Sequence, residues 1–85
     1  MYRNMYFTYI LKSVNSGRYY IGSCRDTKQR LEYHNNGRVK STRPYKPWEI
    51  VHIEEFPDIS SAYKREVEIK KLKSRKAIER IIKHW

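Results

Sequence analysis

The stretch MYFTYILKSVNSGRYYIGSC, residues 5–24, decides the fold. Its first part, residues 5–11, is rich in aromatic and β-branched side chains, which predicts a buried strand. Asn15-Ser16-Gly17 signals a turn, and residues 19–24 predict the second strand of a hairpin. Gly22 lies inside that strand, where a glycine often marks the close approach of another backbone or of a ligand.

A helix, a loop and a third strand are predicted after the hairpin. Asp26 can cap a helix that runs to about Asn35, and Gly37 can end it in a left-handed turn. Residues 40–47 form a basic loop that contains proline, and residues 48–53 predict the third strand.

Two more helices are predicted in the last part of the chain. Asp58 or Ser60 can cap one over residues 61–73, and Ser74 can cap the other from Arg75 to the end. The last helix carries an apolar stripe that we assign to the core: Ala77, Ile78, Ile81, Ile82 and Trp85. The order β-β-α-β-α-α predicts an α+β fold, with helices flanking a small three-stranded, mainly antiparallel sheet. A length of 85 residues allows a single domain, residues 1–85.

The charge balance favours a polyanionic partner. Lys and Arg number 19 against 9 Asp and Glu, a formal net charge of +10. Nucleic acid is the first candidate and an anionic membrane surface the second, while a merely solvated basic surface is the third interpretation.

Cysteine content and hydropathy restrict the compartment. Cys24 is the single cysteine, so neither an intramolecular disulfide nor a cysteine-based metal site can form. The apolar segment 5–11 is too short for a signal peptide, and no run approaches the roughly 20 apolar residues of a spanning helix. We therefore expect a soluble, cytoplasmic protein without a membrane segment.

Tyrosines of the hairpin and basic residues of the first helix are candidates for chemistry. Tyr9 and Tyr20 stand in the two strands, and a phenol can transfer a proton if its surroundings lower its pKa. Arg30 and His34 share one helix face, where a guanidinium can clamp a phosphate and an imidazole can relay a proton. The alternative is tyrosines that only pack, with an exposed Arg30 and a half-buried His34.

Glu66 contradicts its helical neighbours. At about 100° per residue it falls inside an apolar arc made up of Ala62, Tyr63, Val67, Ile69 and Leu72. A carboxylate on a core-facing stripe must be paired or bind a metal, because an isolated one is expensive to desolvate. A structural ion pair and a metal ligand both remain open, since Mg²⁺ commonly needs only one or two carboxylates.

The loop before the third strand is a candidate nucleic-acid contact. Lys40, Arg43 and Lys46 can fix phosphates, and the ring of Tyr45, with Trp48 following, can stack on an unpaired base. The alternative is an ordinary solvated loop.

The ordered set of these residues resembles the GIY-YIG nuclease family. Tyr20-Ile21-Gly22 is similar to the second half of the family signature, and Tyr9 to the tyrosine of the first half. Arg30-Leu31 with His34-Asn35 resembles the helix motif of the family, and Glu66 its metal-binding glutamate. The likeness covers nearly the whole chain and is nearest to small stand-alone bacterial members.

The resemblance implies a metal-dependent endonuclease that hydrolyses a phosphodiester bond in DNA. It implies recognition of structure rather than sequence and a setting in DNA repair, with RNA left open as a substrate. Tyr9 would be the general base, directly or through water, and Tyr20 would shape the site and share that role. Arg30 would stabilise the pentacovalent phosphate with His34 as a donor or proton relay, and Glu66 would hold one Mg²⁺ or Mn²⁺.

Two departures from the family pattern bear on activity. Phe7 and Thr8 stand in place of the glycine and isoleucine before the first tyrosine. Ser23 stands where some members carry a lysine, which removes a cation near the phosphate. The alternatives on the same fold are a binding module that does not cleave and a module that recruits a partner enzyme. The sequence leaves the oligomeric state open.

Overall fold

The hairpin of residues 5–24 forms the centre of the structure, a computed structural model in which residues 5–84 are described. β1 (Tyr6–Ser13) pairs antiparallel with β2 (Tyr19–Cys24) on one side and with β3 (Trp48–Phe56) on the other. The sheet order is therefore β2-β1-β3, and the predicted α+β class with its three-stranded sheet is confirmed. All the pairings are antiparallel.

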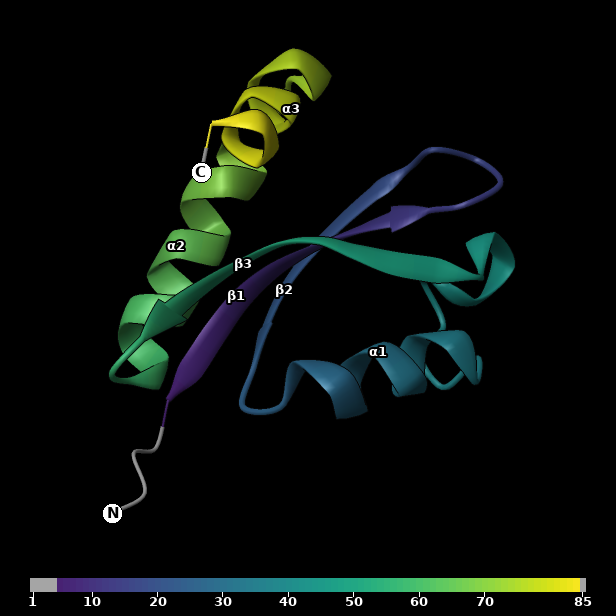
Figure 1. The fold of residues 1–85 in the computed structure, drawn as a ribbon, viewed down its shortest axis with the longest axis horizontal. Helices are drawn as coiled ribbons and strands as arrows, with labels where there is room; N and C mark the ends of the chain where they lie inside the picture. Colours follow the sequence, from purple (N-terminus) through teal and green to yellow (C-terminus); the bar gives the residue numbers. More distant parts are fainter. Residues whose placement is uncertain (1–4, 85) are drawn as a thin grey trace.

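Helices cover both faces of the sheet (Figure 1). α1 (Thr27–Asn35) and the short 3-10 turn η1 (Arg43–Tyr45) pack on one face. α2 (Ile59–Lys71) and α3 (Arg75–Lys83) pack on the other. This layering places α1, which carries Arg30 and His34, and α2, which carries Glu66, on opposite sides of the same strands.

Caps fix where the helices begin. The side chains of Asp26, Asp58 and Ser74 each accept a hydrogen bond from the backbone N–H three residues later. Because Asp58 rather than Ser60 is the cap, α2 begins at Ile59, earlier than predicted.

A residue in the left-handed conformation lies just past the end of α1 and just past the end of α2. Gly37 has a φ of +74°, which confirms the left-handed turn after α1. α2 ends at Lys71, before the predicted end at Lys73, because Lys73 itself has a φ of 48°.

β3 runs past its predicted end at Ile53. The sequence continues with two glutamates, which disfavour a strand. In the structure Glu54 is buried and accepts hydrogen bonds from His52 and Arg65, so its charge is paired and the strand reaches Phe56.

Two separate hydrophobic clusters lie on the two faces of the sheet. The α1 face holds Tyr9, Leu11, Cys24 and Trp48. The α2 face holds Ile10, Ile21 and Ile69, and the side chains of Ile78, Ile81 and Ile82 pack against them. Three residues of the predicted stripe of α3 thus contact the core, whereas Ala77 is only half-buried and Trp85 lies outside the described residues.

The predicted apolar arc of α2 includes residues that are exposed in the structure. Ala62, Glu66 and Ile69 are buried, whereas Tyr63 and Leu72 are 59% and 43% exposed. The sheet is narrow, so only one row of α2 side chains meets it. Within residues 5–84, none of the helices has the length and apolar content needed to cross a membrane.

Candidate active site across the edge strand

A chain of buried hydrogen bonds links β1, α1 and the loop before β3. The Tyr9 hydroxyl lies 3.1 Å from Nε2 of His34, and Nδ1 of His34 lies 2.8 Å from Oγ1 of Thr42. The Thr42 hydroxyl in turn donates to the carbonyl of Val39 at 3.3 Å. His34 is 1% exposed, so it is more deeply buried than in the alternative interpretation of a half-buried histidine.

These bonds determine which nitrogen of His34 carries the proton. A carbonyl can only accept, so the single hydroxyl proton of Thr42 points to Val39 and its oxygen accepts from Nδ1–H of His34. In a neutral imidazole Nε2 is then the acceptor, and the Tyr9 hydroxyl donates to it. The arrangement is that of a base oriented by a third group.

The electrostatics of the pair keep Tyr9 protonated and His34 neutral. Burial raises the pKa of the Tyr9 phenol well above its ordinary value; Tyr20 adds to the rise and Arg30 opposes it. Burial, followed by the charge of Arg30, lowers the pKa of His34. The condition that the surroundings lower the tyrosine pKa is thus not met at Tyr9, because its buried site disfavours the phenolate.

Gly22 makes room for the Tyr9 phenol over the edge strand. The two residues are paired in the register of β1 and β2, and a Cβ at Gly22 would lie 2.5 Å from the Tyr9 hydroxyl oxygen. The close approach predicted at Gly22 is therefore made by a side chain of the same site. The ring of Tyr20 packs beside it, with its centroid 4.9 Å from that of His34.

Arg30 lies on the exposed side of α1, one turn before His34. Its guanidinium is 5.8 Å from the Tyr33 ring centroid, and its charge acts on the pKa values of Tyr9, Cys24 and His34. An exposed guanidinium beside the hydrogen-bonded pair Tyr9 and His34 can bind a phosphate from solvent.

Glu66 approaches the same edge of the sheet from the opposite face. Its Oε1 accepts from the Ser23 hydroxyl at 2.6 Å, and its Oε2 forms an ion pair with Nζ of Lys70 at 2.6 Å. Ser23 follows Gly22 in β2, so these two positions face opposite sides of the sheet. The carboxylate therefore lies next to Ser23 on one side, and the Tyr9 phenol lies next to Gly22 on the other. The carboxylate also raises the pKa of Tyr9, as the least of the causes after burial.

The partner of Glu66 in this ion pair, Lys70, is half-exposed. The Lys70 side chain is 50% exposed and that of Glu66 12%. Lys70 also brings an ammonium to the place beside Ser23, where some members of the family carry a lysine. The departure at Ser23 therefore does not leave this end of the site without a cation.

The donor set fits one hard divalent cation bound mostly by water and substrate. No cluster of three or more His, Cys, Asp or Glu side chains occurs within residues 5–84. Glu66 offers a single carboxylate, whose Oε2 is held by a lysine that can move into water. Mg²⁺ commonly binds through one or two carboxylates, whereas a structural zinc site needs four ligands.

The other departure, at Thr8, has a structural role. Thr8 is fully buried, and its hydroxyl donates to the carbonyl of Ala62 at 2.6 Å. This bond ties α2 to β1 one turn before Glu66, so it helps to set the height of the carboxylate along the sheet.

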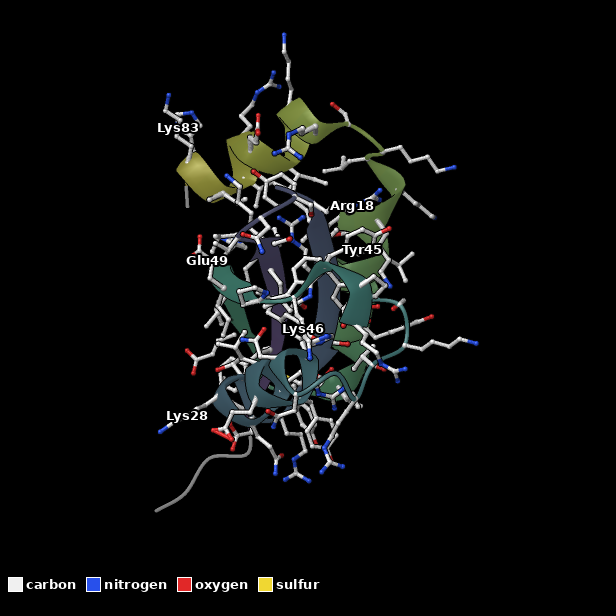
Figure 2. All side chains as sticks on the ribbon, turned by 90° about the vertical axis from the view of Figure 1, so that its right-hand side faces the viewer. Arg18, Lys28, Tyr45, Lys46, Glu49 and Lys83 are labelled. Atoms are coloured by element: carbon white, nitrogen blue, oxygen red, sulfur yellow. The ribbon has the colours of Figure 1, made fainter. Side chains whose placement is uncertain are left out.

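The basic loop is exposed at the end of the molecule seen in Figure 2. Lys40, Arg43 and Lys46 are exposed and Tyr45 is half-buried. Arg43 donates to the carbonyl of Gly37 at 2.7 Å, just after α1. Trp48, in contrast, is 4% exposed and donates to Thr42, so the expectation that it stacks on a base is wrong.

Two residues of the site were not singled out from the sequence. Thr42 holds His34, and Lys70 pairs with Glu66. Lys70 had a signal, since it lies four residues after Glu66 on one helix. Thr42 had none, because eight residues and a loop separate it from His34.

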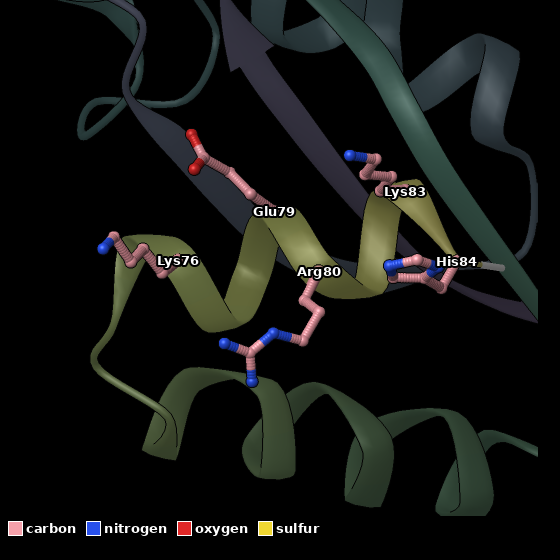
Figure 3. Close-up of a pocket in the computed structure, with 5 residues that line it drawn as sticks. All are labelled: Lys76, Glu79, Arg80, Lys83 and His84. Atoms are coloured by element: carbon pink, nitrogen blue, oxygen red, sulfur yellow. The ribbon is translucent and has the colours of Figure 1, made fainter.

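A shallow hollow on α3 lies outside this site. It has a volume of about 270 Å³ and is lined by Lys76, Glu79, Arg80, Lys83 and His84 (Figure 3). These side chains all come from α3 and its end, and none of them is part of the site around Tyr9 or Glu66.

Acid is expected to destabilise the fold through His34. The unfolded chain takes up a proton at His34 below pH 6.5, whereas the lowered pKa keeps the folded imidazole neutral. The stabilising contribution is therefore present above pH 6.5 and lost as the pH falls toward the folded pKa. Thermal melts of His34→Gln should lose less stability than wild type between about pH 7 and pH 5.

The exposed His84 supplies the control for this prediction. His84→Gln should keep the wild-type loss of stability in acid. An equal acid loss in His34→Gln and wild type would show that other groups cause it.

Comparison with known proteins identifies the family of the chain. A family model described as the GIY-YIG catalytic domain matches residues 5–79. A UPF0213 protein of Staphylococcus epidermidis is 42% identical over 66 residues, which cover 76% of this chain and 79% of the relative. A UPF0213 protein of Listeria welshimeri is 42% identical over 70 residues, which cover 81% of this chain and 77% of the relative. The solution NMR structure of a UPF0213 protein from Bacillus halodurans has a TM-score of 0.58 at 31% identity, over 93% of this chain and 83% of that one. The chain therefore belongs to the GIY-YIG nuclease family.

Proposed function

We propose that this protein is a divalent-metal-dependent endonuclease that hydrolyses a phosphodiester bond in DNA and is directed by structure rather than sequence. The observation that carries the proposal is the Tyr9–His34–Thr42 hydrogen-bond chain, which ends at a phenol beside Arg30. Such an enzyme acts in the cytoplasm on DNA under repair, and RNA is a second substrate to test.

Tyr9 and His34 move the proton in this proposal. The attacking water gives a proton to the Tyr9 oxygen while the Tyr9 proton passes to Nε2 of His34. The hydroxide attacks phosphorus, the bond from phosphorus to the leaving oxygen breaks, and that oxygen takes a proton from solvent. Because the two transfers are concerted, Tyr9 never becomes a free phenolate, which accords with its raised pKa.

The remaining residues stabilise charge and position the phosphate. Arg30 binds the non-bridging oxygens, where negative charge grows in the transition state. Glu66 would hold one Mg²⁺ or Mn²⁺, which supplies Lewis acidity toward the phosphate when bound. Tyr20 packs on His34 and limits where the phosphate can lie.

The proposal is tested by a nicking assay on labelled duplex, flap and single-stranded DNA, with and without Mg²⁺ or Mn²⁺. The expected result is cutting that needs the metal and is abolished in Tyr9→Phe. A protein that binds these DNAs and leaves all of them intact with either metal would contradict the proposal.

The alternative function is a binding module that does not cleave, and one observation favours it. The Lys70 ammonium forms an ion pair with Oε2 of Glu66. The side chain of Lys70 thus already supplies a monovalent cation at the carboxylate that would hold the metal. The same assay separates the two functions, because a binding module gives no nicks at any metal concentration.

DNA binding is expected to be steeply dependent on salt. Each phosphate contact should contribute about one unit of slope to log affinity against log salt concentration. Changing Lys40, Arg43 and Lys46 to Ala should flatten that slope by up to about three units. Fluorescence anisotropy of a labelled duplex over a salt series measures it.

A triple variant elsewhere controls for net charge. Lys64, Arg80 and Lys83 are exposed cations of α2 and α3, and Lys83 lies far from Lys46 in Figure 2. Changing these three to Ala removes the same charge and should change the slope less. Equal slopes in the two triple variants would contradict a role of the loop.

A further inference from the structure

A pocket with a volume of about 350 Å³ lies where three segments far apart in the sequence meet. The hairpin contributes Arg18 and Tyr20, the loop before β3 contributes Thr42 and Tyr45, and the start of α3 contributes Arg75. This volume falls within the range of about 300–1,000 Å³ that is usual for small-ligand sites.

The walls of the pocket are tied to the fold. The Ser13 hydroxyl donates to the Tyr45 carbonyl at 2.6 Å, which joins η1 to the hairpin. Arg75 donates to the carbonyl of Gly17 at 2.8 Å, and Trp48 donates through its indole to the carbonyl of Thr42 at 2.9 Å. A ligand would therefore meet a cavity that is already formed.

The lining selects a ligand that is both aromatic and anionic. The Arg18 guanidinium lies 4.2 Å from the Tyr45 ring centroid, and that of Arg75 lies 4.6 Å from the Tyr19 centroid. Arg75 also pairs with Glu79, whereas Arg18 makes no ion pair in the part of the chain that the structure describes. None of the described residues that line the pocket is acidic. An aromatic ring can stack on a base, and a guanidinium without an acidic partner can donate hydrogen bonds to a phosphate.

The pocket shares two residues with the proton-transfer site. Thr42 lines it and also holds Nδ1 of His34, and Tyr20 lines it while its ring packs on His34. The Tyr20 ring centroid is 6.5 Å from that of Tyr9. Among residues 5–84, no hydrogen bond is made by the Tyr20 hydroxyl, so it is available to a ligand at this shared wall.

The geometry points to a binding site for one unpaired nucleotide next to the phosphate that is cut. A base in a perfect duplex must first leave its pair and its stack to enter such a pocket, whereas a base in a flap, bulge or gap is already free. This inference rests on the proposed function, since it defines the substrate class of that site as DNA with an unpaired nucleotide beside the cut.

The experiment places the fluorescent base 2-aminopurine at an unpaired or a paired position of otherwise identical DNA. Protein is added without divalent metal, so no cutting occurs and stacking is read from the fluorescence. The unpaired probe should be quenched at saturation and bound about tenfold more tightly than the paired one. With Mg²⁺ or Mn²⁺ added, nicks should fall next to the unpaired position.

Two variants test the pocket and two control for them. Tyr45→Ala should remove the quench, and Arg18→Ala, an exposed change that spares the core, should weaken binding of the unpaired probe several-fold. Tyr63→Ala and Arg80→Ala remove the same groups from exposed positions of α2 and α3 and should bind as wild type does. Circular dichroism confirms that each variant is folded.

The outcomes separate this inference from the proposed function. Equal quenching of paired and unpaired probes, or wild-type quenching in Tyr45→Ala together with wild-type affinity in Arg18→Ala, overturns the pocket even if the protein nicks DNA. A selective quench that Tyr45→Ala loses, with weaker binding of the unpaired probe by Arg18→Ala, supports the pocket even if no metal restores cutting, in which case the proposed function fails instead.

Discussion

Arg30→Ala is expected to slow cleavage by about two to three orders of magnitude and to leave DNA binding nearly unchanged. The guanidinium lies on the exposed side of α1, where its charge already acts on the pKa values of Tyr9 and His34. Its bonds to phosphate oxygens strengthen as charge develops in the transition state, so its loss lowers the rate more than the affinity. Single-turnover rates at saturating protein measure the effect.

Lys28 supplies the control for Arg30. It is an exposed cation of the same helix on a different face, so Lys28→Ala should cut at the wild-type rate. Arg30→Lys should rescue poorly, because an ammonium lacks the planar fork that binds two phosphate oxygens. If Arg30→Ala turned over like wild type, Arg30 would be an ordinary surface cation.

Glu66→Gln is expected to abolish metal-dependent cutting while DNA is still bound. The amide oxygen can still accept from Ser23, so the change removes the charge and little else. DNA binding should hold or tighten, because one negative charge near the phosphate is gone. Mn²⁺ titration followed by electron paramagnetic resonance should show that the variant has lost the wild-type site.

The half-exposed Lys70 changes how this variant must be tested. A buried ion pair would make Glu66→Gln destabilising by about 3–5 kcal/mol. Lys70 can instead return to water, and such a pair contributes only about 0–1 kcal/mol, so a thermal melt should move little. Metal affinity is the decisive quantity.

Lys70→Met provides the matched variant for metal binding. Without the competing ammonium, the free Oε2 of Glu66 should bind Mn²⁺ up to about fivefold more tightly. If Glu66→Gln and Lys70→Met both left Mn²⁺ binding unchanged, Glu66 would not be a metal ligand.

The fold was predictable because its strong signals are local. The aromatic and β-branched residues 5–11, the turn at Gly17 and the caps Asp26 and Ser74 each act within a few residues. The turn and the two caps occur as predicted, and the strand occurs at Tyr6–Ser13, two residues past its predicted end. Gly22 was identified as a point of close approach for the same reason, although its contact, Tyr9, was not foreseen.

The parts of the site that escaped prediction depend on contacts between distant segments. The burial that raises the pKa of Tyr9 comes from the packing of α1 on the sheet, and no local pattern encodes it. The bond from Thr42 to His34 likewise requires the loop to fold back over α1. Tyr63 and Leu72 were placed in the core by helical periodicity, which cannot tell how wide the opposing sheet is.

The two hydrophobic clusters give the two halves of the site separate mechanical supports. Tyr9 belongs to the cluster under α1, whereas Glu66 stands on α2 beside Ile69 of the other cluster. Local openings of a protein involve contiguous units of structure, and here the sheet lies between the units. An opening of the α2–α3 layer would carry the carboxylate away from Ser23 while the phenol and the imidazole stay in register. Amide exchange in α2 and in α1 should therefore respond differently to a core substitution such as Ile81→Ala, and one half of the site can change over evolution while the other is preserved.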